Sequence, residues 1–75
     1  MDVTFRTTVF IEDAEHIVDV EAEVTGFYED NVKVKILDVY SITTSETIDW
    51  QNVFTLRQKS MLEDLAIDET PYLQV

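Results

Sequence analysis

The sequence predicts an α+β fold, in which a three-stranded antiparallel β-meander is followed by one C-terminal amphipathic helix packed on the sheet. Residues 3–11, 16–24 and 32–36 alternate apolar and polar side chains, a period of two that is typical of strands with one buried face. Short segments separate these stretches, so we expect consecutive strands to form antiparallel hairpins. Residues 56–69 change to a helical spacing of apolar side chains, which predicts a helix that covers the sheet.

The strands are expected over residues 2–11, 16–25 and 31–42. The polar segment 12–15 forms the first turn, and Gly26, the only glycine, begins the second, where a positive φ is often needed. Folding the chain about these turns places every apolar cross-strand pair on one face. On the other face it sets side chains of opposite charge beside each other. A slip of one residue would break this agreement.

The register follows from the same two turns. It places Val9 opposite Val18 in the first hairpin and Val20 opposite Ile36 in the second. After Ile36 the alternation changes phase, which indicates either a β-bulge near residues 36–38 or a strand covered on both faces. The simple register then gathers four apolar side chains at one end of the outer face, and these are candidates for self-association: Phe10, Ile17, Leu37 and Val39.

The helix has a recognisable beginning and end. Thr55 and Gln58 have the spacing of a capping box, and Pro71 pushes the residue before it out of the helical region. Four apolar residues form the stripe that should face the sheet: Met61, Leu62, Leu65 and Ala66. Residues 43–54 are expected to form a loop with a helical turn that closes one end of the core.

The length and composition fit one small domain, residues 1–75. A chain of 75 residues buries only about 60% of its unfolded surface. It contains no cysteine, which fits a reducing compartment. Neither a signal peptide nor an apolar run long enough to cross a membrane is apparent. We therefore expect a soluble protein of the cytoplasm.

The charge is strongly one-sided. Sixteen acidic residues face five basic residues, for a formal net charge of -11. Nucleic acids and anionic membranes both bind basic surfaces, so direct binding to either is not expected. The acidity indicates a basic protein partner, such as a nucleic-acid-binding protein. The alternative is that the charge only maintains solubility.

No catalytic or ligand-binding pattern is present. His16 is the only histidine, and no cysteine accompanies it, so a transition-metal site lacks its usual ligands. The acidic turn at residues 12–15 lacks the residue order of a dedicated calcium loop. The single glycine cannot form a phosphate-binding loop. We expect neither an enzyme nor a bound cofactor or metal.

Acidic residues gather at the end of the predicted helix where the helix dipole favours cations, and a turn carries adjacent aromatics. Ile67 is expected on the helix face opposite the apolar stripe. These features supply the candidate partner-binding residues. The acidic ones are Glu29, Asp30, Glu63, Asp64, Asp68 and Glu69, and the apolar or aromatic ones are Phe27, Tyr28 and Ile67.

Three segments carry a resemblance to a group of known proteins: residues 20–28, 32–39 and 62–66. Together they resemble small acidic proteins encoded by bacteriophages, in which a short β-meander precedes one amphipathic helix. Some of these look like inhibitors of host or defence proteins, including mimics of DNA charge. The resemblance implies protein binding without catalysis, and it assigns no role to any single residue.

Two functions remain open from the sequence. The first is a non-enzymatic acidic module that binds and blocks a basic protein surface, whose binding should weaken with salt. The second is a structural or assembly protein that self-associates into a homo-oligomer through its outer apolar patch.

Overall fold

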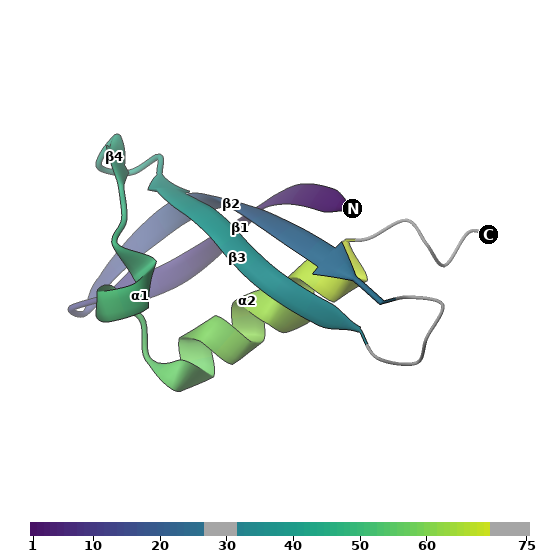
Figure 1. Ribbon diagram of the computed structural model, residues 1–75. Coiled ribbons are helices and arrows are strands. Elements are labelled where there is room, and N and C mark those ends of the chain that lie inside the picture. Colours follow the sequence, from purple (N-terminus) through teal and green to yellow (C-terminus); the bar gives the residue numbers. More distant parts are fainter. Residues whose placement is uncertain (27–31, 70–75) are drawn as a thin grey trace.

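The computed structural model describes residues 1–26 and 32–69 and has the α+β fold that the sequence predicts (Figure 1). The sheet is antiparallel and has four strands in the order β1-β2-β3-β4. The elements are β1 (Asp2–Ile11), β2 (Ala14–Thr25), β3 (Lys33–Ser41), β4 (Glu46–Thr47), α1 (Trp50–Val53) and α2 (Leu56–Asp68). The predicted meander corresponds to β1, β2 and β3, on which α2 packs. β4 adds only two residues at the edge of β3.

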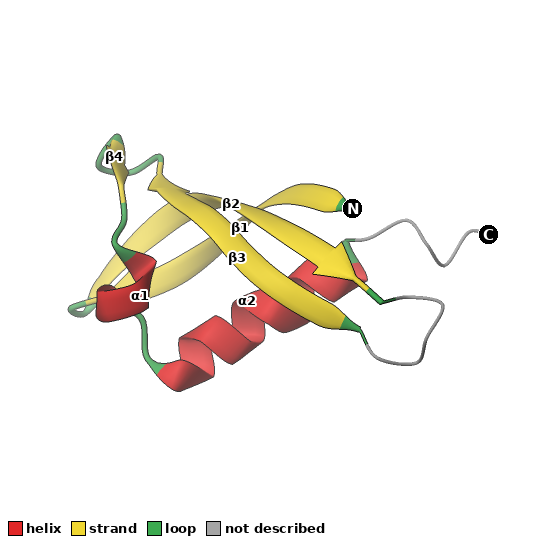
Figure 2. Cartoon of the chain, in the orientation of Figure 1, coloured by secondary structure: helices red, strands yellow, loops and turns green. Residues whose placement is uncertain are grey.

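The core lies between α2 and one face of the sheet (Figure 2). Alternate residues of β1 and β2 point into it, as the alternation predicts, whereas in β3 the alternation is interrupted after Ile36. From α2 it receives Leu62 and Ala66, both of which are inaccessible to solvent. The prediction that Met61 also faces the sheet is wrong, because 41% of that residue is exposed. Leu65 is half-buried.

The turn between β1 and β2 is shorter than predicted. It consists of Glu12 and Asp13, whose φ angles are 51° and 66°, as a two-residue type I′ turn requires. Val9 therefore lies opposite His16 and not opposite Val18. The predicted pairing was displaced by two residues, and an even displacement leaves every side chain on its expected face. The second hairpin shows the same displacement, with Ala22 opposite Ile36.

A β-bulge interrupts the pairing of β2 with β3, which is the first of the two alternatives that the sequence left open. Ala22 pairs with Ile36 and Glu21 pairs with Asp38, so Leu37 is the extra residue. The bulge reverses the phase of everything that follows it. Val39 is consequently buried in the core, and its predicted place on the outer face is wrong.

The segment before α2 contains the expected helical turn, which is α1. Phe54, directly after α1, is buried, and Trp50 packs partly against the core. α2 begins with the predicted capping box, because Thr55 accepts from the Gln58 main-chain N–H and the Gln58 side chain accepts from the Thr55 N–H. Neither helix in the described part of the chain has the length and apolar character needed to cross a membrane.

Candidate functional site

The outer face of the sheet, opposite α2, carries exposed apolar side chains. Both helices pack from the core side (Figure 2), and none of the described residues forms a layer over the outer face. Between 36% and 61% of each of five large apolar residues there is exposed. These residues form what we call the outer patch: Phe10, Ile17, Leu37, Tyr40 and Ile42.

The hydrogen bonds of the sheet hold the centre of the outer patch. The Ile42 N–H donates to the main-chain oxygen of Ile17 at 2.8 Å, which extends the pairing of β2 with the residue after β3. The Ile17 N–H in turn donates to Oγ1 of Thr43 at 2.9 Å. Ile17 is thus fixed on both of its main-chain groups. A binding surface built on paired strands needs little ordering when a partner arrives.

Carboxylates lie among the apolar residues of the outer patch. Glu15 lies opposite Phe10 on the neighbouring strand, and Asp19 lies opposite Tyr40. Towards the other end of the sheet, Glu21 lies opposite Asp38 at the bulge. The outer patch is therefore an apolar surface with carboxylates in the rows of Phe10, Tyr40 and the bulge, and with none in the central row of Thr8, Ile17 and Ile42.

One of these carboxylates is already paired. Arg6 lies opposite Asp19, and its Nε donates to Oδ1 of that residue at 2.8 Å. This hydrogen bond, together with the attraction between the charges, lowers the pKa of Asp19 and raises that of Arg6. Within residues 1–26 and 32–69, it is the only ion pair between side chains. Among the described residues, no other carboxylate near the outer patch forms an ion pair.

The structure leaves exposed on the outer face three of the four residues that the sequence placed in this patch, namely Phe10, Ile17 and Leu37. Tyr40 and Ile42 were missed. The signal for them was the change of phase after Ile36, because a one-residue bulge moves each later residue of the strand to the opposite face.

The acidic end of α2 forms a separate surface. Asp64, Asp68 and Glu69 are exposed, and no basic residue occupies the last turn of the helix. α2 lies on the core side and ends near the other end of the sheet from the outer patch (Figure 1). Glu63 is half-buried. Ile67 packs partly against the core, so its predicted exposure on the opposite face is wrong.

The remaining predicted contact residues lie outside the described part of the chain. These are Phe27, Tyr28, Glu29 and Asp30.

His16 has a partner that the sequence did not reveal. Its Nδ1 lies 3.1 Å from Oγ of Ser41. The same oxygen accepts from the Thr44 N–H at 3.2 Å, and Ser41 is completely buried. A hydroxyl that substrate cannot reach does not serve as a nucleophile. The contact has a structural role, because it joins the β1–β2 hairpin to β3 and the turn that follows it.

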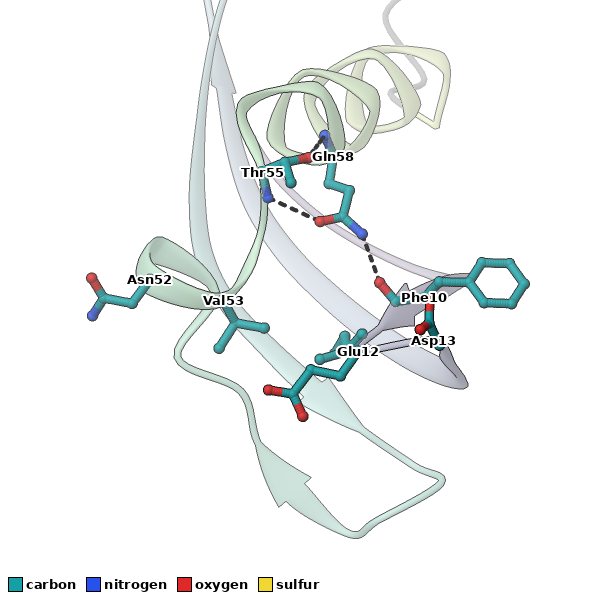
Figure 3. Close-up of a pocket in the computed structure, with 8 residues that line it drawn as sticks. Phe10, Glu12, Asp13, Asn52, Val53, Thr55 and Gln58 are labelled. Atoms are coloured by element: carbon teal, nitrogen blue, oxygen red, sulfur yellow. Dashed lines mark hydrogen bonds between the residues drawn. The ribbon is translucent and has the colours of Figure 1, made fainter.

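An open depression of about 590 Å³ lies between the β1–β2 turn and the start of α2 (Figure 3). Glu12 and Asp13 line one side, and Val53, Thr55 and Gln58 line the other. The polar groups of Thr55 and Gln58 are already bonded to each other, and Gln58 also donates to the Phe10 carbonyl. The Phe10 ring points away from the depression (Figure 3). The polar groups on the α2 side of the depression are therefore already used within the protein, which leaves the carboxylates of Glu12 and Asp13 for a ligand.

The described residues contain no cluster of three or more acidic or histidine side chains arranged to hold a metal ion. Comparisons with protein-family models, with curated proteins and with solved structures find no match. The functional argument therefore rests on the geometry of this chain, where the outer patch is an exposed apolar surface that folding leaves unexplained.

Proposed function

We propose that this chain is a non-enzymatic binding protein that docks the outer patch on a protein surface with apolar residues surrounded by lysine and arginine. The observation that supports this is the mixture of exposed apolar side chains and carboxylates on one face of the sheet, where residues 1–26 and 32–69 form no covering layer and only Asp19 has an ion-pair partner. By covering a cationic surface, such a protein would block whatever anionic ligand that surface binds, nucleic acid included.

The apolar part of the outer patch would supply most of the affinity. Phe10 and Tyr40 are aromatic, and tyrosine is among the side chains that dominate interface energetics. Ile17 lies centrally, between Thr8 on β1 and the backbone of Ile42. A partner that covers Ile17 would remove the exposed part of this apolar side chain from water, which is favourable.

The acidic part would select the partner and accelerate the encounter. The formal net charge of -11 attracts a cationic protein over long distances, and salt screens this attraction. Glu15 and Asp19 lie within the contact area itself. A partner that presents carboxylates there would be rejected, because like charges across an interface are unfavourable.

The second function considered from the sequence, self-association through this same patch, is less well supported. Two outer faces packed on each other would bring Glu15, Asp19, Glu21 and Asp38 of one copy near the same residues of the other. Each chain also carries the full net charge of -11. A basic partner avoids both repulsions.

A capture experiment with matched variants tests the proposal. Tagged wild-type protein, Ile17→Lys and Leu56→Lys are each incubated with bacterial lysate at low salt. Leu56 is 83% exposed on α2, so both variants replace an exposed apolar residue by lysine and change the net charge equally. Phe10→Lys serves as a second variant of the patch, and circular dichroism verifies folding.

We expect wild type and Leu56→Lys to capture the same basic proteins, and Ile17→Lys and Phe10→Lys to lose them. High salt should release these proteins from wild type. Capture that is indifferent to salt would contradict the electrostatic part. Capture that Ile17→Lys and Leu56→Lys lose equally, or no basic protein captured at all, would overturn the proposal.

A further inference from the structure

Among the described residues, no strand pairs with the outer edge of β1, which is the first strand of the sheet. Val24 donates its N–H to the main-chain oxygen of Met1 at 2.8 Å, which shows that odd-numbered residues of this segment point their main-chain groups towards β2. Successive residues of a strand point these groups to opposite sides. The groups of Thr4, Arg6 and Thr8 therefore point away from the sheet.

A second hydrogen bond supports this assignment independently. Nε2 of Gln58, on α2, reaches the main-chain oxygen of Phe10 at 2.7 Å, which requires that the Phe10 carbonyl point outwards. Among the described residues, this is the only side chain or strand that bonds to the outer edge of β1. Within the described part of the chain, the edge from Thr4 to Thr8 is therefore a row of main-chain donors and acceptors with no partner.

The other edge of the sheet is protected by features that natural proteins use to prevent strand pairing. β3 carries the bulge at Leu37, two lysines, Lys33 and Lys35, and the short strand β4. β1 has none of these. Its ten residues pair with β2 without interruption, and it contains neither proline, glycine nor lysine.

The charges along β1 indicate what covers its edge. Residues 3–11 contain no carboxylate, although the chain has sixteen, and the one cation, Arg6, is neutralised by Asp19. A basic strand would find no acidic side chain here to recognise. A second copy of this strongly acidic chain would meet no repulsion from carboxylates of β1 between Val3 and Ile11, because that segment has none.

We propose that two copies of this chain pair their β1 strands antiparallel, edge to edge, to form a continuous eight-stranded sheet. The residues select the register. A two-fold axis at Arg6 would set two arginines opposite each other, which is unfavourable. An axis at Thr7 instead sets Arg6 opposite Thr8 of the partner subunit, and Phe5 opposite Val9 of the partner subunit.

The identity of residue 7 agrees with this register. On the inward face of β1 it is the one polar residue in the series Val3, Phe5, Thr7, Val9 and Ile11, and it is half-buried. At the axis the two threonines would be direct neighbours, and threonine pairs across strands are favourable. The register also pairs the outward main-chain groups of Arg6 and Thr8 with each other, away from the Phe10 carbonyl that Gln58 already occupies.

This proposal is independent of the outer patch and responds oppositely to salt. Two chains of charge -11 repel each other, so salt should strengthen the dimer, whereas it should weaken binding to a basic partner. The two proposals can therefore fail separately, because the salt dependence of dimerisation and that of partner binding are measured independently. An edge used for another protein's strand, or for none, would leave the purified chain monomeric.

Sedimentation equilibrium and amide hydrogen exchange test the pairing. We expect the purified protein to reach twice the 8.7 kDa mass of the chain as its concentration rises, sooner at high salt. The amides of Thr4, Arg6 and Thr8 should gain protection over the same range of concentration. A constant mass of one chain, or rapid exchange of these three amides at every concentration, would overturn the proposal.

Matched variants locate the interface. Thr8→Lys places a charge at the edge, and Thr25→Lys makes the same change on β2, where the main chain pairs with β3. We expect Thr8→Lys to weaken the dimer about tenfold or more and Thr25→Lys to retain it. Thr8→Pro removes the outward N–H and should act likewise. Equal dimerisation of all three variants would contradict the register.

Discussion

Gln58 at the start of α2 donates a hydrogen bond from Nε2 to the main-chain oxygen of Phe10 near the end of β1, at 2.7 Å. The same side chain accepts from the Thr55 N–H through its other terminal atom. One residue therefore caps the helix and attaches it to the edge of the sheet, 48 positions away in the sequence. The relationship fixes where α2 begins relative to the outer patch.

Replacing this residue separates its two roles. Gln58→Glu keeps an acceptor for the Thr55 N–H and loses the donor to Phe10, so the β1–β2 turn should open more often while α2 keeps its cap. We expect the Ile11 amide to exchange about fivefold faster, since a hydrogen bond of this kind contributes about 1 kcal/mol. Gln58→Ala, which removes both bonds, should also accelerate exchange in the first turn of α2. Unchanged exchange at Ile11 in both variants would show that the bond to Phe10 has no stabilising role.

The packing of α2 predicts unequal effects for two neighbours. Leu62→Ala removes a completely buried side chain and should lower the free energy of unfolding by about 2–5 kcal/mol. Met61→Ala, at a half-exposed position, should lower it by less than about 1 kcal/mol. Urea denaturation measures both. Similar losses for the two variants would mean that the helix is rotated from the orientation described.

The β1–β2 turn should be open to stabilisation. Glu12 and Asp13 both have a positive φ, which is unfavourable for residues with a Cβ atom. The double substitution Glu12→Asn and Asp13→Gly supplies residues that a type I′ turn prefers, and we expect the free energy of unfolding to rise by about 1–2 kcal/mol.

A second turn provides the control. Ser45 also has a positive φ of 57°, so Ser45→Gly should be stabilising. Its neighbour Thr44 does not have a positive φ, and Thr44→Gly should be destabilising because glycine loses more conformational freedom on folding. Thermal unfolding measures all of these variants. A loss of stability in the double variant would exclude the described turn.

The Arg6–Asp19 pair predicts a pH dependence. Because Arg6 lowers the pKa of Asp19 in the folded state, the pair stabilises the protein above the ordinary carboxyl pKa of about 3.9, and this contribution disappears as the pH falls through the lowered value. Asp19→Asn should therefore melt at a slightly lower temperature than wild type near neutral pH and at the same temperature in strong acid. The comparison cancels the titration of the other carboxylates. A difference in melting temperature that persists in strong acid would contradict an ionic origin.

The sequence predicted the faces of the strands better than their pairing. Alternation in β1 and β2 identified the buried residues because a side chain's face depends only on its position within the strand. The register depended on turn length, and Glu12-Asp13 lacks the asparagine or glycine that usually marks a two-residue turn. The placement of Val39 failed for a related reason, since the bulge changed the face of every residue after Leu37.

The rotation of α2 could not be read from periodicity alone. Met61 and Ile67 both lie beside the buried positions Leu62 and Ala66, and spacing leaves open which flank faces the sheet. Contacts distant in sequence accompany the observed rotation: Gln58 bonds to Phe10, and Lys59 donates to the Gln51 carbonyl at 2.9 Å. In this rotation Ile67 packs partly against the core and Met61 is exposed. Of the candidate site, the sequence supplied Phe10, Ile17 and Leu37, and the bulge concealed Tyr40 and Ile42.

The central claim is that the outer patch, and not the acidic end of α2, contacts the protein partner. Chemical-shift mapping tests it most directly, with isotope-labelled protein titrated with the partner that the capture experiment identifies. The account predicts the largest changes at Ile17, Tyr40 and Ile42, with little change at Asp64 and Asp68. The largest changes at Asp64 and Asp68, with Ile17 unaffected, would contradict it.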